Sequence, residues 1–308
     1  MSNMVQYGMW GNCSNHCDFC LKKDKRELTP EQLIREIAET RKNISIIDWE
    51  GKFHDGISLL GGELFHIKDP KVQDAFMELI DDIIEKILKK VPTAVFSCVT
   101  NGIYHPAFLY RVMDRFRDTV GMRRVDIAFS YDLQYRFHSV EARNLVVQNI
   151  LDFMKRYDHT LVVQMILTQH VINLCKAGTW SPNYFETEEI PGTILSFLYP
   201  HPIFDGCDKP TKKLPDFQFK RKDLFWFIRW LKDHNERCYY SFLSSTQHSG
   251  IYKYTGRFDK DLDGFVEQPK LTDGKEEIAP CGHSKLYRCY SDCDKCLQCD
   301  LESLEVLE

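Results

Sequence analysis

The sequence predicts an α/β fold, a partial (β/α)6 TIM-like barrel with a small C-terminal cysteine-rich extension. Two observations predict it. Short apolar runs alternate with segments of helical periodicity, which is typical of a parallel sheet covered by helices. Five cysteines then gather near the end of the 308-residue chain. We expect residues 1–235 to form the barrel, and residues 236–308 to form a linker and the extension.

The expected strands are short apolar runs, several of which stop at glycine, asparagine or another polar residue. They cover residues 5–9, 57–60, 94–100, 124–130, 161–167 and 193–198. In a barrel of parallel strands, functional groups gather where the strands end. Side chains that follow these six runs are therefore the candidates for a site.

Apolar residues at helical spacing predict helices after most of these strands. The first helix has a clear start, with Thr29 as N-cap, Pro30 at the first position and Gln32 at the third. The expected helices cover residues 28–40, 72–90, 106–116, 140–156 and 222–234.

Composition limits the class of protein. Hydrophobic residues make up 43% of the chain, which is enough for a sizeable core, and no apolar run approaches the ~18 residues of a membrane span. The N-terminus lacks the pattern of a signal peptide, so we expect a cytoplasmic protein with no membrane partner. Twelve cysteines then indicate metal ligands or buried thiols rather than disulfides. The net charge of −5 argues against general nucleic-acid binding.

Three cysteines follow the first expected strand at the spacing C-x3-C-x2-C: Cys13, Cys17 and Cys20. Thiolates suit iron–sulfur clusters or zinc. Three of them on one loop can hold three corners of a cubic cluster and leave the fourth corner open. The alternative is a zinc site with His16 or Asp18 as the fourth ligand.

A second motif, Gly61-Gly62-Glu63, follows the second expected strand. Two glycines let the backbone approach a ligand closely. The carboxylate that follows them is able to accept a hydrogen bond from an ammonium group.

Together the two motifs resemble the radical S-adenosylmethionine (SAM) superfamily. The resemblance implies an enzyme with a [4Fe–4S] cluster on Cys13, Cys17 and Cys20, whose open iron is chelated by SAM. The reduced cluster would cleave SAM to a 5′-deoxyadenosyl radical that abstracts a hydrogen atom from the substrate. It also implies a reductant such as flavodoxin or ferredoxin. We assign no catalytic residue beyond the cluster ligands.

The resemblance further implies that SAM is held by residues near the strand ends, with the Gly-Gly-Glu motif at its amino group. Some of these positions have ordinary readings, because Phe19 can merely shield the cluster and Asn101 can belong to a simple turn. The expected SAM-binding residues are Phe19, Gly61, Gly62, Glu63, Asn101, Ser130, Asp132, Gln164 and Tyr199.

The C-terminal cysteines resemble the SPASM and twitch extensions of radical SAM enzymes, which carry auxiliary [4Fe–4S] clusters. The candidate metal ligands are Cys281, Cys289, Cys293, Cys296 and Cys299. Five thiols are too few for two fully ligated clusters, so we expect one, held by the last four or with Cys281 in place of one of them. The alternative is a structural zinc. Four other cysteines are isolated: Cys98, expected as a buried hydrophobe, Cys175, Cys207 and Cys238.

Relatives with such tails often modify peptides, so a peptide or protein side chain is the leading substrate. A nucleotide or nucleoside is the alternative, because a basic stretch follows the sixth strand and offers contacts for phosphate. A non-catalytic iron–sulfur or zinc protein is a third hypothesis. The basic stretch comprises Lys209, Lys212, Lys213, Lys220, Arg221 and Lys222. The alternative for this stretch, and the one the composition favours, is a solvated loop that leads into a helix.

Overall fold

A computed structural model describes residues 4–11, 13, 15, 17, 28–52, 55–198, 216, 221–247, 257–259 and 264–266. Several expectations concern residues outside this set. They are those for His16, Asp18, Phe19, Cys20, Tyr199, Cys207, Lys209, Lys212, Lys213, Lys220, Cys281, Cys289, Cys293, Cys296 and Cys299.

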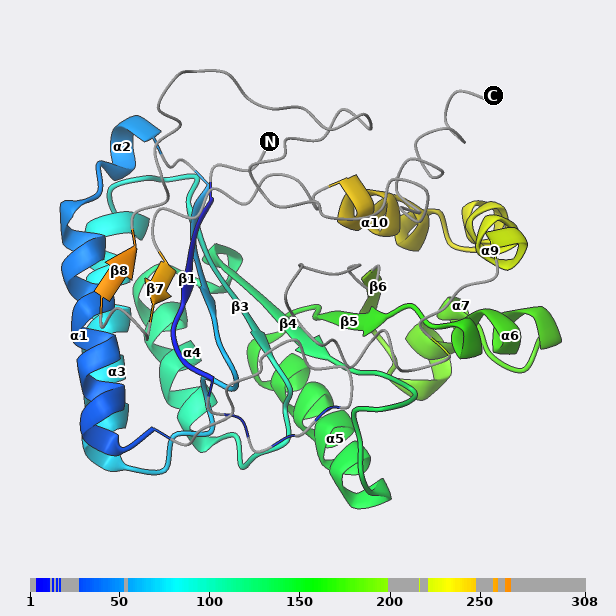
Figure 1. Cartoon of the computed structure of the whole chain (residues 1–308), viewed down its shortest axis with the longest axis horizontal. Coiled ribbons are helices and arrows are strands. Elements are labelled where there is room, and N and C mark those ends of the chain that lie inside the picture. Colours follow the sequence, from blue (N-terminus) through cyan, green and yellow to red (C-terminus); the bar gives the residue numbers. More distant parts are fainter. Residues whose placement is uncertain are drawn as a thin grey trace.

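Six strands form one sheet in the described part of the chain, and each strand pairs in parallel with the next one in sequence. This confirms the α/β fold class and all six expected strands (Figure 1). Because neighbours in sequence are parallel neighbours in space, the carboxyl ends of all six strands lie at one edge. The strands are β1 (Met4–Gly8), β2 (Gly56–Leu60), β3 (Val95–Thr100), β4 (Val125–Ser130), β5 (Val162–Ile166) and β6 (Ile194–Leu198).

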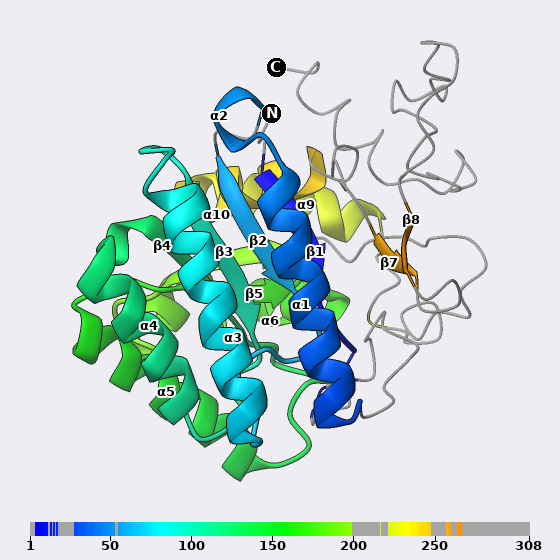
Figure 2. The ribbon, with the colours of Figure 1, turned by 90° about the vertical axis from the view of Figure 1, so that its left-hand side faces the viewer.

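Helices connect the strands, and Figure 2 shows α1, α3 and α4 side by side across one face of the sheet. All five expected helices are confirmed: α1 (Pro30–Ile46), α3 (Pro70–Ile83) with its π-helical continuation η1 (Ile84–Leu88), α4 (Ala107–Thr119), α5 (Val140–Tyr157) and α9 (Arg221–His234). The sequence did not predict α2 (Trp49–Lys52), η2 (Met122–Arg124), α6 (Gln169–Ala177), α7 (Pro182–Tyr184), η3 (Phe185–Glu189) or α10 (Glu236–Gln247). A short antiparallel pair, β7 (Arg257–Asp259) and β8 (Gly264–Val266), completes the described elements.

The start of α1 forms as the sequence predicted. The Thr29 amide donates to Gln32 Oε1 at 2.9 Å, and the Gln32 amide donates to Thr29 Oγ1 at 3.3 Å. This capping box satisfies amide donors that the first helical turn leaves free.

Buried apolar residues of the helices and strands form the core between the sheet and the helices that cover it. The apolar stripe of α3 belongs to it: Val72, Phe76, Leu79, Ile80 and Ile83 are all fully buried. At the entry to β2 the backbones come so close that a Cβ on Gly56 would lie 2.0 Å from the Val95 oxygen. Gly56 also has a φ of +112°, which L side chains rarely adopt.

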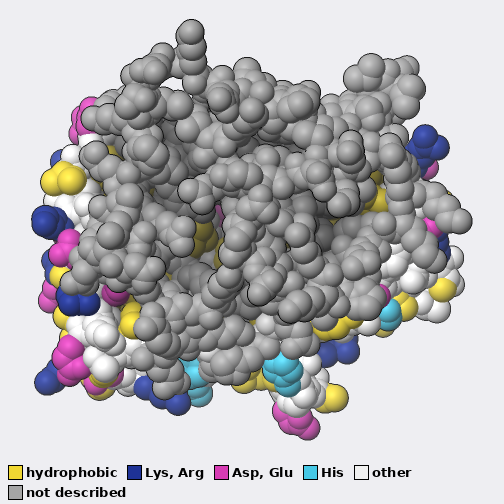
Figure 3. Space-filling model, in the orientation of Figure 1, with side chains coloured by type: hydrophobic (Ala, Val, Ile, Leu, Met, Phe, Trp, Pro, Cys, Tyr) yellow, Lys and Arg dark blue, Asp and Glu magenta, His cyan; other side chains and the backbone are white. Residues whose placement is uncertain are grey.

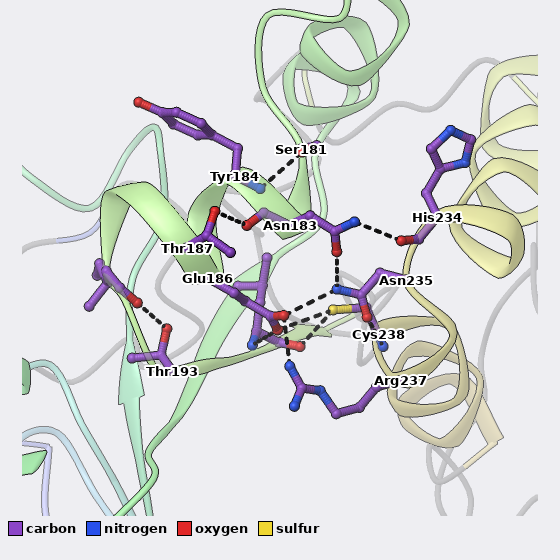
Figure 4. A network of polar contacts seen from close by, with 12 residues as sticks. Ser181, Asn183, Tyr184, Glu186, Thr187, Thr193, His234, Asn235, Arg237 and Cys238 are labelled. Atoms are coloured by element: carbon purple, nitrogen blue, oxygen red, sulfur yellow. Dashed lines mark hydrogen bonds and ion pairs between the residues drawn. The ribbon is translucent and has the colours of Figure 1, made fainter.

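Helix α10 packs against β6, so the described chain continues onto the sheet beyond residue 235. Figure 4 shows the polar network at this junction. Glu186 accepts from the Leu195 amide of β6 at 2.7 Å and pairs with Arg237 of α10 at 2.7 Å. The Cys238 thiol is buried and donates to the Leu195 oxygen at 2.9 Å. The expected domain boundary therefore falls between α9 and α10, at Asn235.

Charges of both signs are interspersed among the described side chains visible in Figure 3. Ion pairs also join neighbouring helices, such as Arg41 of α1 with Asp82 of α3 at 2.6 Å and Arg156 of α5 with Asp114 of α4 at 2.7 Å. In the part of the chain that the structure describes, no helix is both long and apolar enough to cross a bilayer.

Candidate active site

The loop that carries the cysteines is joined to the Gly-Gly-Glu segment at the carboxyl ends of β1 and β2. The Gly62 amide donates to the Trp10 backbone oxygen at 2.7 Å, and the Trp10 indole N–H donates to the Glu63 backbone oxygen at 3.2 Å. A Cβ on Gly61 would lie 3.0 Å from Leu64 Cδ2 and 3.4 Å from the Trp10 oxygen. Glycine at this position therefore lets the two segments approach closely.

Glu63 is buried and links the end of β2 to the end of β3. Its carboxylate accepts from Thr100 Oγ1 at 2.8 Å, from the Asn101 amide at 2.7 Å and from the Phe65 amide at 3.1 Å. Burial raises the pKa of Glu63 to about 7, although these hydrogen bonds favour the charged form. These contacts fix the carboxylate between β2 and β3, and its role toward SAM stays a prediction.

Asn101 connects this buried carboxylate to the first cysteine. Its backbone amide donates to Glu63, and its side-chain Nδ2 donates to Cys13 Sγ at 3.3 Å. Oδ1 of the same side chain accepts from the Ile103 amide at 2.7 Å, which fixes the orientation of the side-chain amide. The sequence predicted Asn101 as a site residue at SAM, and the structure places it against the cysteine loop.

Asn149 of α5 supports the turn after Asn101, and sequence reasoning missed it. Its Nδ2 donates to the Gly102 oxygen at 2.7 Å and to the Tyr104 oxygen at 2.9 Å. The side chain is buried, so it satisfies two carbonyl groups that water does not reach. A polar residue on the apolar side of a predicted helix was the signal available in the sequence.

Two side chains donate toward the second cysteine, and the sequence predicted neither. Asn15 Nδ2 lies 3.1 Å from Cys17 Sγ, and Arg136 Nη1 lies 3.7 Å from it. Arg136 follows β4 and is buried, at 9% exposure. Burial opposes a charged guanidinium, but the nearby Asp132 and Cys17 outweigh this and raise the pKa of Arg136. The arginine therefore brings a positive charge to the cysteine loop.

Asp132, an expected SAM-binding residue, holds this arginine. One carboxylate oxygen pairs with Arg136 Nε, and the other accepts from the Ile166 amide at 2.6 Å. Burial raises the pKa of Asp132, while the charge of Arg136 opposes that rise. Asp132 thus ties the loop after β4 to the end of β5.

Ser130 and Gln164, two further expected SAM-binding residues, are register partners on β4 and β5. Both are half-buried. The structure thus brings them side by side, Ser130 as the last residue of its strand and Gln164 within β5.

The donor set suits anionic sulfur. Each described cysteine of the motif receives an amide N–H, and Cys17 also faces a guanidinium. Such donors stabilise thiolates and the clusters that thiolates bind. Among the described residues no group of three His, Cys, Asp or Glu side chains is arranged to hold a metal. Cys20, the third expected ligand, lies outside that set.

The isolated cysteines that the structure describes lie in buried surroundings that favour the neutral thiol over the thiolate. Cys98 is fully buried in β3, as expected of a hydrophobic residue, and burial raises the pKa of its thiol. Burial likewise raises the pKa of Cys175 to about 12 and that of Cys238. These thiols stay neutral and belong to the packing.

Comparisons with known proteins gave no match to a family model and none to a curated protein. Solved structures that resemble the chain include anSMEcpe with bound AdoMet, at 14% identity and a TM-score of 0.47, covering 75% of this chain and 59% of that one. A native form of anSMEcpe gives 14% identity, a TM-score of 0.45 and coverage of 75% and 60%. Streptococcus suis SuiB gives 9% identity, a TM-score of 0.47 and coverage of 77% and 47%. This chain therefore matches about three fifths or less of each, and at these values no property is carried over from them.

Proposed function

We propose that this protein is a radical SAM enzyme. The observation that carries the proposal is the junction of the cysteine loop with the Gly-Gly-Glu segment, at the carboxyl ends of β1 and β2. It unites the two sequence motifs at one place in the fold. The hydrogen-bond donors around Cys13 and Cys17 support it, because they suit thiolate ligands.

The residues divide the work as follows. Cys13, Cys17 and Cys20 would hold a [4Fe–4S] cluster. When bound, that cluster would supply the electron that cleaves SAM and so generate a radical able to abstract hydrogen from the substrate. Gly61 and Gly62 would let the backbone approach SAM at its amino end.

The other residues expected at SAM complete its binding site. Glu63 fixes the segment by its hydrogen bonds to the end of β3 and would accept from the amino group of bound SAM. Ser130 and Gln164 would supply polar contacts from β4 and β5. For Phe19 and Tyr199 the proposal rests on the family resemblance alone, which implies a role at the adenine. Asn101 and Asp132 act on the cysteine loop as well.

The substrate we propose is a peptide or protein side chain. The support is the cysteine-rich tail, which resembles those of peptide-modifying radical SAM enzymes. In this proposal residues 1–235 carry the radical chemistry, and residues 236–308 include one auxiliary [4Fe–4S] cluster. Its candidate ligands are Cys281, Cys289, Cys293, Cys296 and Cys299. A flavodoxin or ferredoxin in the cytoplasm supplies the electron.

A nucleotide or nucleoside is the second candidate substrate, and one contact favours it. The Tyr135 hydroxyl donates to Asp216, which lies within the basic stretch 209–222. Tyr135 directly precedes Arg136, so this contact brings Asp216 to the loop beside the cysteines. The lysines of the basic stretch would attract phosphate.

The experiment is anaerobic reconstitution with iron and sulfide, followed by reduction and assay of 5′-deoxyadenosine from SAM. Replacing Cys13, Cys17 and Cys20 together by Ala should abolish the product, because each thiolate holds one iron. Cys98→Ala is the matched control, since that buried thiol belongs to β3, and it should retain activity. Undiminished product from the triple variant would refute the proposal.

Iron content tests the tail in the same preparations. The wild-type chain should hold about eight irons, and the triple variant about four, from two four-iron sites. Replacing Cys293 and Cys296 by Ser should remove the other half and leave SAM cleavage in the barrel detectable. If the tail binds one zinc and no iron, the auxiliary cluster is refuted and the tail has a structural role.

A further inference from the structure

The loop after β4 is built to hold one arginine against the cysteine loop. Tyr135, directly before Arg136, has a φ of 65°. Residues other than glycine rarely adopt this region, and such strain persists only where surrounding contacts enforce it. Here the enforcing contacts are those of Asp132 and of the Tyr135 hydroxyl with Asp216.

Two nitrogens of the planar Arg136 guanidinium contact two different partners. Nε pairs with Asp132, which is itself fixed by the Ile166 amide, and this leaves Nη1 3.7 Å from Cys17 Sγ. Lysine has one charged nitrogen on a flexible stem and cannot reproduce this geometry. Asp132 and Arg136 are only 3% and 9% exposed, so solvent screens their charges little.

We propose that Asp132 positions Arg136 so that its charge raises the reduction potential of the cluster bound through Cys17. A reduced cluster carries one more negative charge than the oxidised one. Nearby positive charge and hydrogen bonds to the sulfurs therefore favour the reduced state. The amide donors from Asn15 and Asn101 act in the same direction. The inference rests on the proposed function, since it requires a cluster on these cysteines.

The consequence is that Arg136 acts before SAM binds. It makes the cluster easier for a biological donor to reduce, and Asp132 is a positioning residue for that effect. A guanidinium that served SAM alone would change the affinity for SAM and leave the potential of the SAM-free cluster unchanged.

The test is a redox titration of the reconstituted full-length protein without SAM, followed by EPR. The signal of the barrel cluster is the one that the Cys13/Cys17/Cys20 triple variant lacks. In Arg136→Gln the midpoint should become more negative, with at least a tenfold shift in the equilibrium, which is 59 mV for one electron. Arg136→Lys keeps the charge but loses the fork, and its midpoint should fall between Gln and wild type.

Arg143→Gln is the matched control, because that guanidinium bonds to Tyr131 and Glu189. Its midpoint should equal that of the wild type. An Arg136→Gln variant with full iron and the midpoint of this control would overturn the inference. If Arg136→Gln loses its cluster, Arg136→Met, which also removes the charge, decides, and a wild-type midpoint potential there overturns the inference. Failure of the proposed function is distinct, because the wild-type chain itself would then show no signal from a cluster on Cys13, Cys17 and Cys20.

Discussion

Replacing Glu63 by Gln should change how the stability of the apo-protein depends on pH. In the folded chain burial raises the pKa of this carboxyl from 4.5 to about 7. The unfolded chain loses the proton near 4.5, while the folded chain keeps it until about 7. Between these values the folded state binds more protons, so its stability decreases as pH rises.

The size of the effect follows from the same two values. At about 1.4 kcal/mol per pH unit, the wild-type protein should lose about 2–3 kcal/mol from this group between pH 5 and pH 8. The glutamine variant has no such loss, because its side chain does not titrate. It pays a fixed cost of about 1–3 kcal/mol instead, because its amide group faces a buried N–H donor such as that of Asn101.

The assay is urea unfolding of the apo-protein at pH 5 and pH 8, followed by tryptophan fluorescence. The Trp10 indole reports on the site because it donates a hydrogen bond to the backbone oxygen of Glu63. The difference in unfolding free energy between wild type and variant should shrink by about 2–3 kcal/mol at the higher pH. Glu78→Gln, on an exposed part of α3, controls for loss of a surface carboxylate. Parallel pH profiles for wild type and Glu63→Gln would refute the reasoning.

Two further predictions concern the scaffold of the site. Gly56→Ala should lower the unfolding free energy by more than about 3 kcal/mol, because the new Cβ meets the Val95 oxygen of β3 at 2.0 Å. Gly178→Ala, at a φ of +68° in open space, should cost only about 1–2 kcal/mol, and equal losses in urea unfolding would contradict the reasoning. Asn149→Leu should cost about 1–3 kcal/mol because it leaves the Gly102 and Tyr104 oxygens unpaired, and an unchanged unfolding midpoint would contradict this.

Local signals in the sequence were sufficient for the strands and for the first helix. The strands of a parallel sheet are buried on both faces and appear as short apolar runs. The start of α1 depends on Thr29 and Gln32, three residues apart, so its capping box was readable directly. Helix α6 is only nine residues long and gave too little periodicity to stand out.

The site was predicted less completely, because several of its contacts join residues far apart in sequence. The C-x3-C-x2-C spacing indicated Cys13 and Cys17 as ligands, but Arg136 reaches Cys17 from 119 residues away. Asn101 was expected at SAM from its place after a strand, and only the folded chain places its side chain at Cys13. Likewise, the burial of Glu63 follows from the packing of β2 against β3 and has no sequence signal of its own.

The proposed function requires that SAM binds a cluster held by the N-terminal cysteines. The most direct measurement is pulsed EPR of the reduced protein with SAM labelled by ¹⁵N at its amino group and ¹⁷O at its carboxylate. Both labels should couple to the signal of the barrel cluster, and this coupled signal should disappear in the Cys13/Cys17/Cys20 triple variant. A label-coupled signal that persists in that variant, or a wild-type cluster signal that couples to neither label, would refute the proposed function.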